Sequence, residues 1–296
     1  MSFDFAFVLG AADGLPMAAP RLFENGPVWL TNSMAVSVFV ALLLIGFAQY
    51  ATRNISLIPG KAQNFWEIVI ENLSSILEGI LGWKLLKDTF WFFASIFIFI
   101  IACNLQALIP GVGTIGSYVP QNATDTFSFE FHKYVHIPYM RGANADVNMT
   151  LAMSAWFMLL WLYWSFKYNG LTGFVLHIFG PKAKMTGVLG VFLIVVFLGV
   201  GLIEVLSILI RPVALTFRLY GNIYGGEAMI HAIEHMAGHF AFLALIPVYI
   251  FELLVAVVQA LVFCLLTAAF TALMCRHDDH GEHGHGHGDK SHGGGH

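Results

Sequence analysis

One segment of the sequence, residues 204–239, combines an apolar composition with an unusual number of ionisable side chains. It carries two arginines, three glutamates and three histidines among residues that otherwise suit a lipid bilayer. An arginine at the centre of a membrane helix costs about 2.5–3.5 kcal/mol on insertion scales. Ionisable groups at such a depth therefore indicate a functional site, and the rest of the chain is expected to serve as their scaffold.

The composition indicates a polytopic membrane protein. Hydrophobic residues make up 58% of the 296 residues and charged residues only 11%, whereas a soluble domain contains roughly 25% charged residues. The net charge of −4 gives no sign of a nucleic-acid partner. We interpret Cys103, Cys264 and Cys275, which lie in or beside apolar runs, as small core residues rather than as a disulfide or metal ligands.

Long apolar runs predict an all-α polytopic membrane protein with five transmembrane helices and one amphipathic interfacial helix, since about 20 apolar residues cross the hydrocarbon core. The amphipathic helix is expected at residues 61–87, where apolar residues recur at helical spacing between polar ones. Residues 1–28 form an outer N-terminal segment, residues 29–275 a single transmembrane domain, and residues 276–296 a disordered His-rich cytoplasmic tail. The expected spans are 29–50, 89–109, 147–166, 186–236 and 241–275, of which the last two are long and tilted.

Lysine and arginine residues in the connections indicate the orientation of the chain. With the N-terminus outside and five spans, the cytoplasmic segments hold nine of the 14 basic residues and the outer segments three. Arg141 belongs in this scheme to a long outer polar loop, 111–146, and Lys167 to a short basic loop after the third span. By length alone, residues 186–236 could instead form two spans, which would move the C-terminus outside.

The ionisable residues of segment 204–239 fall on two helix faces in succession. At 100° per residue, the first face groups five polar residues: Glu204, Ser207, Arg211, Arg218 and Asn222. Glu227 lies nine residues after Arg218, or about 900°, and therefore points to the opposite side. The second face continues from it at four-residue steps, with one glutamate beside it: Glu227, His231, His235, His239 and Glu234. A polar stripe that changes sides predicts two half-pathways that do not meet, with Arg218 near the changeover.

Two further patterns accompany this stripe. Glu252 and Gln259 are seven residues apart and share a face of the last apolar run. Gly221 and Gly225 form a GxxxG motif, which lets another helix approach closely in lipid.

The run RPVALTFRLYGNIYGGE, residues 211–227, closely resembles the signature of subunit a of F-type ATP synthases, in which an Arg-Leu-aromatic-Gly-Asn core follows Lys/Arg-Pro. Residues 104–110 resemble part of the family's second span, although Ala107 stands where many members have a polar residue. Residues 145–151 resemble the start of its third span, and Gln259-Ala260 resembles the family's Gln that faces the essential Arg. The resemblance covers about residues 30–275 and leaves the tail outside.

The resemblance implies a non-catalytic stator subunit beside a ring of c subunits, each of which presents a carboxylate at mid-membrane. Arg218 matches the essential arginine, Glu227 the acidic position of the proton-uptake half-channel, and Glu252 a position that holds His or Glu. Polar channel-lining positions of the family are matched by Asn222, Glu204 and Gln259. His231 joins this proton path, and His235, Glu234, His239 and Ser207 are secondary candidates. The implied partners are the c-ring, the peripheral-stalk b subunits, other ATP synthase subunits and the lipid bilayer, and no cofactor or metal is implied.

Elementary electrostatics fits this role. The permanent charge of a guanidinium favours the ionised form of an approaching ring carboxylate, by an energy of order 4 kcal/mol at about 4 Å and an effective dielectric constant near 20. Arginine does not deprotonate there, whereas the pKa of a lysine shifts readily when the side chain is buried. Imidazoles along the path titrate near neutral pH, which favours protons over sodium as the coupling ion. Since the sequence shows no transit peptide, we expect the bacterial inner membrane.

Two other functions are compatible with the residues alone. A stand-alone ion transporter or channel would also need ionisable groups in the membrane, although such proteins often contain internal repeats and none is evident here. His231-Ala-Ile-Glu234-His235 also reads as HxxEH, an inverted zinc-protease motif. No distant third ligand accompanies it. The histidines of the tail could bind Zn²⁺ or Ni²⁺ loosely or buffer protons.

Overall fold

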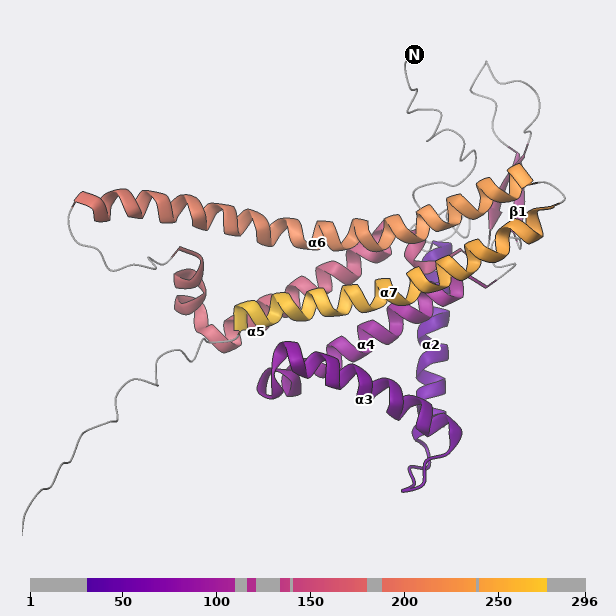
Figure 1. Cartoon of the computed structure of the whole chain (residues 1–296), viewed down its shortest axis with the longest axis horizontal. Coiled ribbons are helices and arrows are strands. Elements are labelled where there is room, and N and C mark those ends of the chain that lie inside the picture. Colours follow the sequence, from indigo (N-terminus) through magenta and orange to yellow (C-terminus); the bar gives the residue numbers. More distant parts are fainter. Residues whose placement is uncertain are drawn as a thin grey trace, which may run out of the picture.

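The structure, a computed structural model, consists almost entirely of helices in the residues that it describes, which are 31–109, 116–120, 134–138, 141–179, 188–237 and 240–275 (Figure 1). In chain order the helices are α2 (Asn32–Thr52), α3 (Lys61–Leu81), α4 (Trp83–Ala107), α5 (Val147–Phe179), α6 (Val188–Ala237) and α7 (Ala241–Cys275). A short 3-10 helix, η1 (Ala143–Ala145), precedes α5. Between α4 and η1, strand β1 (Gly116–Pro120) pairs antiparallel with β2 (Tyr134–Pro138).

Within the described part of the chain, five helices are long and apolar enough to cross a membrane, namely α2, α4, α5, α6 and α7. This confirms the predicted all-α polytopic fold. Helix α2 has 21 residues, or about 31 Å at about 1.5 Å per residue, which matches a hydrocarbon core of about 30 Å. Helix α6 has 50 residues, or about 75 Å. Because α6 and α7 run at a steep angle to α2 (Figure 1), an upright α2 requires both long helices to be tilted.

Several helix boundaries differ from the expected ones, and at the end of the amphipathic helix a glycine gives the reason. The amphipathic helix ends at Leu81 rather than at residue 87, because Gly82 adopts φ 73° and ψ 155°, a conformation that is almost restricted to glycine. Residues 83–87 therefore belong to α4. The third span does not end at residue 166 but continues through Lys167 to Phe179, with a kink at Gly170 (φ 68°). Residues 188–237 form one continuous helix, which agrees with the one-span reading of this region.

Helix α7 packs through a stripe of small buried residues that recur every four positions: Ala256, Ala260, Cys264, Ala268 and Ala272. Small side chains let two helix backbones approach closely in lipid. The stripe faces α4, since the Cys264 thiol lies 3.7 Å from the Phe93 carbonyl oxygen. The three cysteines are buried, as expected for small core residues. Large aromatic side chains fill the adjacent space between α4 and α5, where Phe92 packs against Phe157 and Trp164.

The end of the long loop is buried rather than exposed to water. All six residues from Arg141 to Asp146 are buried, and Gly142 packs so tightly that a Cβ there would lie 2.7 Å from the Cβ of Ala107 on α4. The last six residues of the predicted outer polar loop, 111–146, are therefore packed inside the protein. These residues carry η1 into the space between α2, α4 and α6. The predicted N-terminal segment 1–28 and the His-rich tail 276–296 lie outside the described residues.

Candidate functional site

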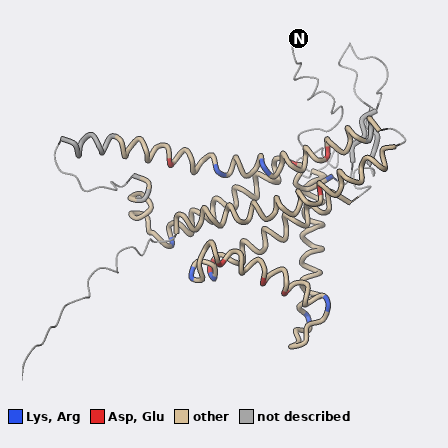
Figure 2. The backbone as a smooth tube through the Cα atoms, viewed as in Figure 1, with Lys and Arg blue, Asp and Glu red and all other residues tan. Residues whose placement is uncertain are grey.

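Charged positions occur in the middle and the C-terminal part of α6 (Figure 2), and they fall into two groups with Arg218 between them. The first group, near the C-terminal end of α6, involves Glu227, and the second, nearer its N-terminal end, involves Glu204. Their positions differ by 23 residues, or about 34 Å along the axis at about 1.5 Å per residue. The two groups therefore form separate polar clusters on one helix.

Glu252 of α7 is buried against the backbone of α6, with 5% of the residue exposed. Its carboxylate occupies the space beside Gly226: a Cβ at that glycine would lie 2.4 Å from Oε2 and 2.7 Å from Oε1 of Glu252. Only a glycine leaves room for the carboxylate in this position. Because Glu227 follows Gly226 directly, both carboxylates lie at the same level of the two helices.

Glu227 forms an ion pair with Arg141, whose Nε lies 3.3 Å from Oε2 of the carboxylate. The Arg141 side chain is 1% exposed and that of Glu227 is 22% exposed. The guanidinium carbon also lies 5.9 Å from the ring centroid of Tyr224, which stacks on Tyr220 at 5.3 Å. Removing one partner of a buried pair typically costs about 3–5 kcal/mol. This contact therefore holds the end of the loop against α6.

Buried amides connect this pair with α4 and α7. The Asn144 amide donates a hydrogen bond to Oδ1 of Asn104 (2.6 Å), and the Asn104 amide donates to the Ala256 carbonyl (3.0 Å). Both asparagines are fully buried. Since Ala256 lies one helical turn after Glu252, the amides lead from the Arg141 segment to the part of α7 that carries the buried carboxylate.

Asp146 attaches the same segment to α2 and α5. Its Oδ2 accepts a hydrogen bond from the Ser33 hydroxyl of α2 (2.7 Å), and its Oδ1 accepts one from the backbone N–H of Asn148 at the start of α5 (3.0 Å). The latter bond satisfies one of the amide groups that every helix leaves unpaired at its N-terminus. Asp146 thus fixes where η1 enters the protein, and with it the position of Arg141.

The sequence prediction did not include Arg141, Asn144 and Asn104 in the site. Arg141 was expected among outer-loop cations, and its pairing with Glu227 joins residues that are 86 positions apart. The available signal was the run RGANAD, in which the residues around Asn144 are small. Small residues directly before a span permit close packing, although they do not reveal the partner.

Arg218 lies on the opposite face of α6 and is exposed at the surface of the chain. The neighbouring positions Gly221, Gly225 and Phe217 are exposed as well, whereas Gly226 is buried against α7. The structure therefore places Arg218 and Glu227 on different sides of the helix, as the angular spacing predicts. Their axial separation of nine residues is about 13 Å.

The second cluster contains Glu204 and Arg211, whose Oε1 and Nη2 atoms are 3.4 Å apart. The guanidinium carbon of Arg211 lies 4.5 Å from the ring centroid of Phe270 on α7, and 14% of its side chain is exposed. Ser207 lies on the same part of α6 and is half-buried. Arg211 thus has a packing partner on α7 and an anionic partner on its own helix.

Among the remaining predicted residues, those that the structure describes differ in burial. Asn222 and Gln259 are half-buried, and His231 is exposed. The side chains of Glu234 and His235, and all of His239, lie outside the described residues. No three His, Cys, Asp or Glu side chains in the described ranges are close enough together to hold a metal ion. The HxxEH motif cannot be assembled from described side chains, because only His231 is among them.

Comparison with known proteins gives a consistent result over most of the chain. The family model described as "ATP synthase A chain" matches residues 34–272. The ATP synthase subunit a of Aliivibrio salmonicida is 30% identical over 257 residues, which cover 84% of this chain and 85% of that protein. The ATP synthase subunit a of Vibrio cholerae is 28% identical over 274 residues, 87% and 89% of the two chains. That of Wigglesworthia glossinidia brevipalpis is 27% identical over 260 residues, 86% of each.

Proposed function

The chain belongs to the ATP synthase A chain family and is a subunit of the membrane sector of an F-type ATP synthase, and we propose that its two polar clusters line two offset half-channels for protons. In this proposal the cluster of Glu227, Glu252 and Arg141 lines the uptake half-channel. The cluster of Glu204 and Ser207 lines the release half-channel.

The observation that carries the proposal is the position of Arg218 between the clusters, on the face of α6 that also carries Glu204 and opposite to the face that carries Glu227. A proton that follows the side chains of one cluster would have to pass around the helix and past a permanent positive charge to reach the other. A fixed cation repels protons and so opposes a direct leak between the half-channels. A proton would then pass from one half-channel to the other on a carrier group that moves past Arg218.

The exposure of Arg218 supports a partner that supplies this carrier. An exposed guanidinium inside the hydrocarbon region is costly, and the glycines beside it allow another helix to approach closely. A ring of c subunits that presents one carboxylate per subunit would meet both conditions. The charge of Arg218 would favour the ionised form of each arriving carboxylate, because the attraction between the two groups is about 4 kcal/mol at about 4 Å. The carboxylate would therefore release its proton.

The remaining residues take supporting roles in the same scheme. Asn222 and Gln259 would provide hydrogen-bonding groups near Arg218, and His231 would lie at the mouth of the uptake pathway, with His235, Glu234 and His239 as further candidates. Arg141 would keep the Glu227 carboxylate oriented in the uptake half-channel. Proton rather than sodium coupling follows from the imidazoles on this path.

The proposed orientation has the N-terminus outside and the C-terminus in the cytoplasm of a bacterial inner membrane. It rests on the excess of lysine and arginine in the connections assigned to the cytoplasm and on the bacterial relatives. In this orientation the Glu227 cluster faces outward and the Glu204 cluster inward. Contacts with the peripheral-stalk b subunits are part of the same proposal. A stand-alone transporter and an HxxEH protease are disfavoured, since neither function belongs to a subunit of this complex.

The test is Arg218→Ala in the complete ATP synthase, assayed in inverted membrane vesicles. We expect loss of ATP-driven proton pumping while ATP hydrolysis persists. The control is Arg53→Ala, which removes an equal charge from an exposed position at the C-terminal end of α2 and should leave pumping unchanged. Normal pumping by the Arg218→Ala complex would refute the proposal.

A further inference from the structure

Two pockets follow one another along the seam between α4 and α5 at the surface of the chain, the first polar and the second apolar. On α4 the seam is lined by residues that lie on one face of the helix: Lys84, Lys87, Asp88, Trp91, Ser95 and Phe99. On α5, which runs antiparallel to α4, the seam extends from Lys167 and Tyr168 to Trp156 and Ala152. Neither proton pathway uses these residues.

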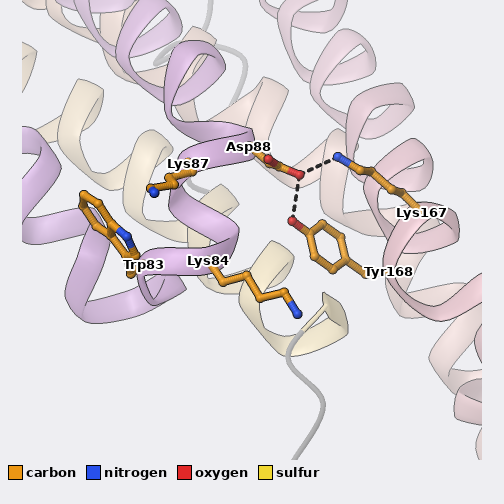
Figure 3. Close-up of a pocket in the computed structure, with 6 residues that line it drawn as sticks. All are labelled: Trp83, Lys84, Lys87, Asp88, Lys167 and Tyr168. Carbon is orange, nitrogen blue, oxygen red and sulfur yellow. Dashed lines mark hydrogen bonds and ion pairs between the residues drawn. The ribbon is translucent and has the colours of Figure 1, made fainter.

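The polar end is an open pocket of about 510 Å³ lined by six residues (Figure 3): Trp83, Lys84, Lys87, Asp88, Lys167 and Tyr168. Asp88 accepts hydrogen bonds from the Lys167 ammonium and from the Tyr168 hydroxyl, the latter at 2.9 Å. The single carboxylate of the pocket is therefore engaged by α5. Three lysines against one aspartate leave a net positive charge of two.

The other two lysines are available to a ligand. Neither Lys84 nor Lys87 forms an ion pair with any carboxylate in the described part of the chain. The Lys87 ammonium lies 4.9 Å from the ring centroid of Trp83, a cation–π contact that leaves its other donors open. Trp83 is 58% exposed, as expected for an indole at the level of lipid headgroups.

The apolar part begins one helical turn further along α4. It is a groove of about 370 Å³ whose floor is formed by the buried side chains of Phe92, Ile96 and Met153. Trp91 and Trp156, each 56% exposed, line it. From Trp91 to Phe99 the groove follows about 12 Å of α4. This is close to half of a hydrocarbon core of about 30 Å, the depth of one leaflet.

We propose that this seam is a binding site for one anionic phospholipid, with the phosphate at Lys84 and Lys87 and an acyl chain in the groove. The charge selects an anionic headgroup, since each lysine near a membrane surface strengthens the binding of acidic lipid about fivefold. The groove selects a lipid over free phosphate, because its indole walls and apolar floor are matched by a hydrocarbon chain.

The test uses the complete ATP synthase in native membranes and phosphatidylglycerol that carries a photoreactive group in its acyl chain. We expect labelled peptides from α4 and α5 around Trp91 and Trp156. The variant Lys84→Gln/Lys87→Gln should reduce this labelling by tenfold or more. The matched control, Arg53→Gln/Lys61→Gln, removes two exposed charges outside the seam and should keep it. Ser95→Trp, which fills the groove but keeps both lysines, should also abolish labelling.

Three results would overturn the proposal. Equal labelling by the phosphatidylcholine analogue would show that charge is not recognised. Displacement of the lipid by inorganic phosphate, but not by sodium chloride at equal ionic strength, would show that the pocket binds the phosphate group alone. Cross-links that join the seam to a transmembrane helix of another subunit would show that protein, not lipid, covers it.

Discussion

Replacing Gly226 by alanine should disable the proposed uptake half-channel without unfolding the protein. The new Cβ would lie 2.4 Å from Oε2 of Glu252, whereas non-bonded atoms need about 3.5 Å. The Glu252 carboxylate must therefore move by about 1 Å. It can do so because it is the end of a flexible side chain, and alanine is also the better helix former by about 1 kcal/mol. Stability should hardly change, while the carboxylate leaves its place beside the backbone of α6 at position 226.

The expected effect on function is large. Displacements of about 1 Å can reduce a rate that depends on precise positioning by up to about a hundredfold, so we expect a tenfold to hundredfold fall in ATP-driven acidification of inverted vesicles. The thermal midpoint of the purified complex should stay unchanged. Gly199→Ala is the control on the same helix, because nothing lies within 4 Å of a Cβ there.

Combination with Glu252→Asp should restore part of the pumping, because the shorter side chain avoids the new methyl group. Pumping at the wild-type rate in Gly226→Ala alone would refute the reasoning, since it would mean that the position of Glu252 does not matter for proton uptake.

Three further changes test the remaining contacts. Arg141→Gln should destabilise the complex by up to about 3 kcal/mol, because it leaves the half-buried Glu227 carboxylate without its cation. The additional change Glu227→Gln should recover much of that stability in a thermal-melting series, and no recovery would contradict the pairing. Gly82→Ala should lower the free energy of unfolding by about 1–3 kcal/mol, since its φ of 73° and ψ of 155° suit only glycine. The control Gly79→Ala, which has open space around its Cβ, should leave stability unchanged. Resistance to detergent denaturation measures both effects. Ala260→Leu should lower the yield of assembled complex, because the small-residue stripe of α7 leaves no space against α4; normal assembly would show that this contact is looser than the structure indicates.

Much of the fold follows from local sequence. In a bilayer every backbone amide must be satisfied within the segment itself, so a sufficiently long apolar run becomes a helix almost regardless of its neighbours. The last span, 241–275, coincides with α7, and the fourth differs from α6 by one or two residues. The change of face between Arg218 and Glu227 is also a local property, because it depends only on the 100° step of a continuous helix.

Tertiary structure decided which groups meet. The pairing of Arg141 with Glu227, the fit of Glu252 beside Gly226 and the seam between α4 and α5 each join residues far apart in the chain. Hydropathy gives no information on such partners, since it treats each segment alone. The polarity of the loop before the third span does not indicate burial, but the acceptors on α6 and α4 made burial of Arg141 and Asn144 possible. The sequence thus determined the helices and the order of their charges, and packing between helices determined which charges are paired and which, like Arg218, remain at the surface.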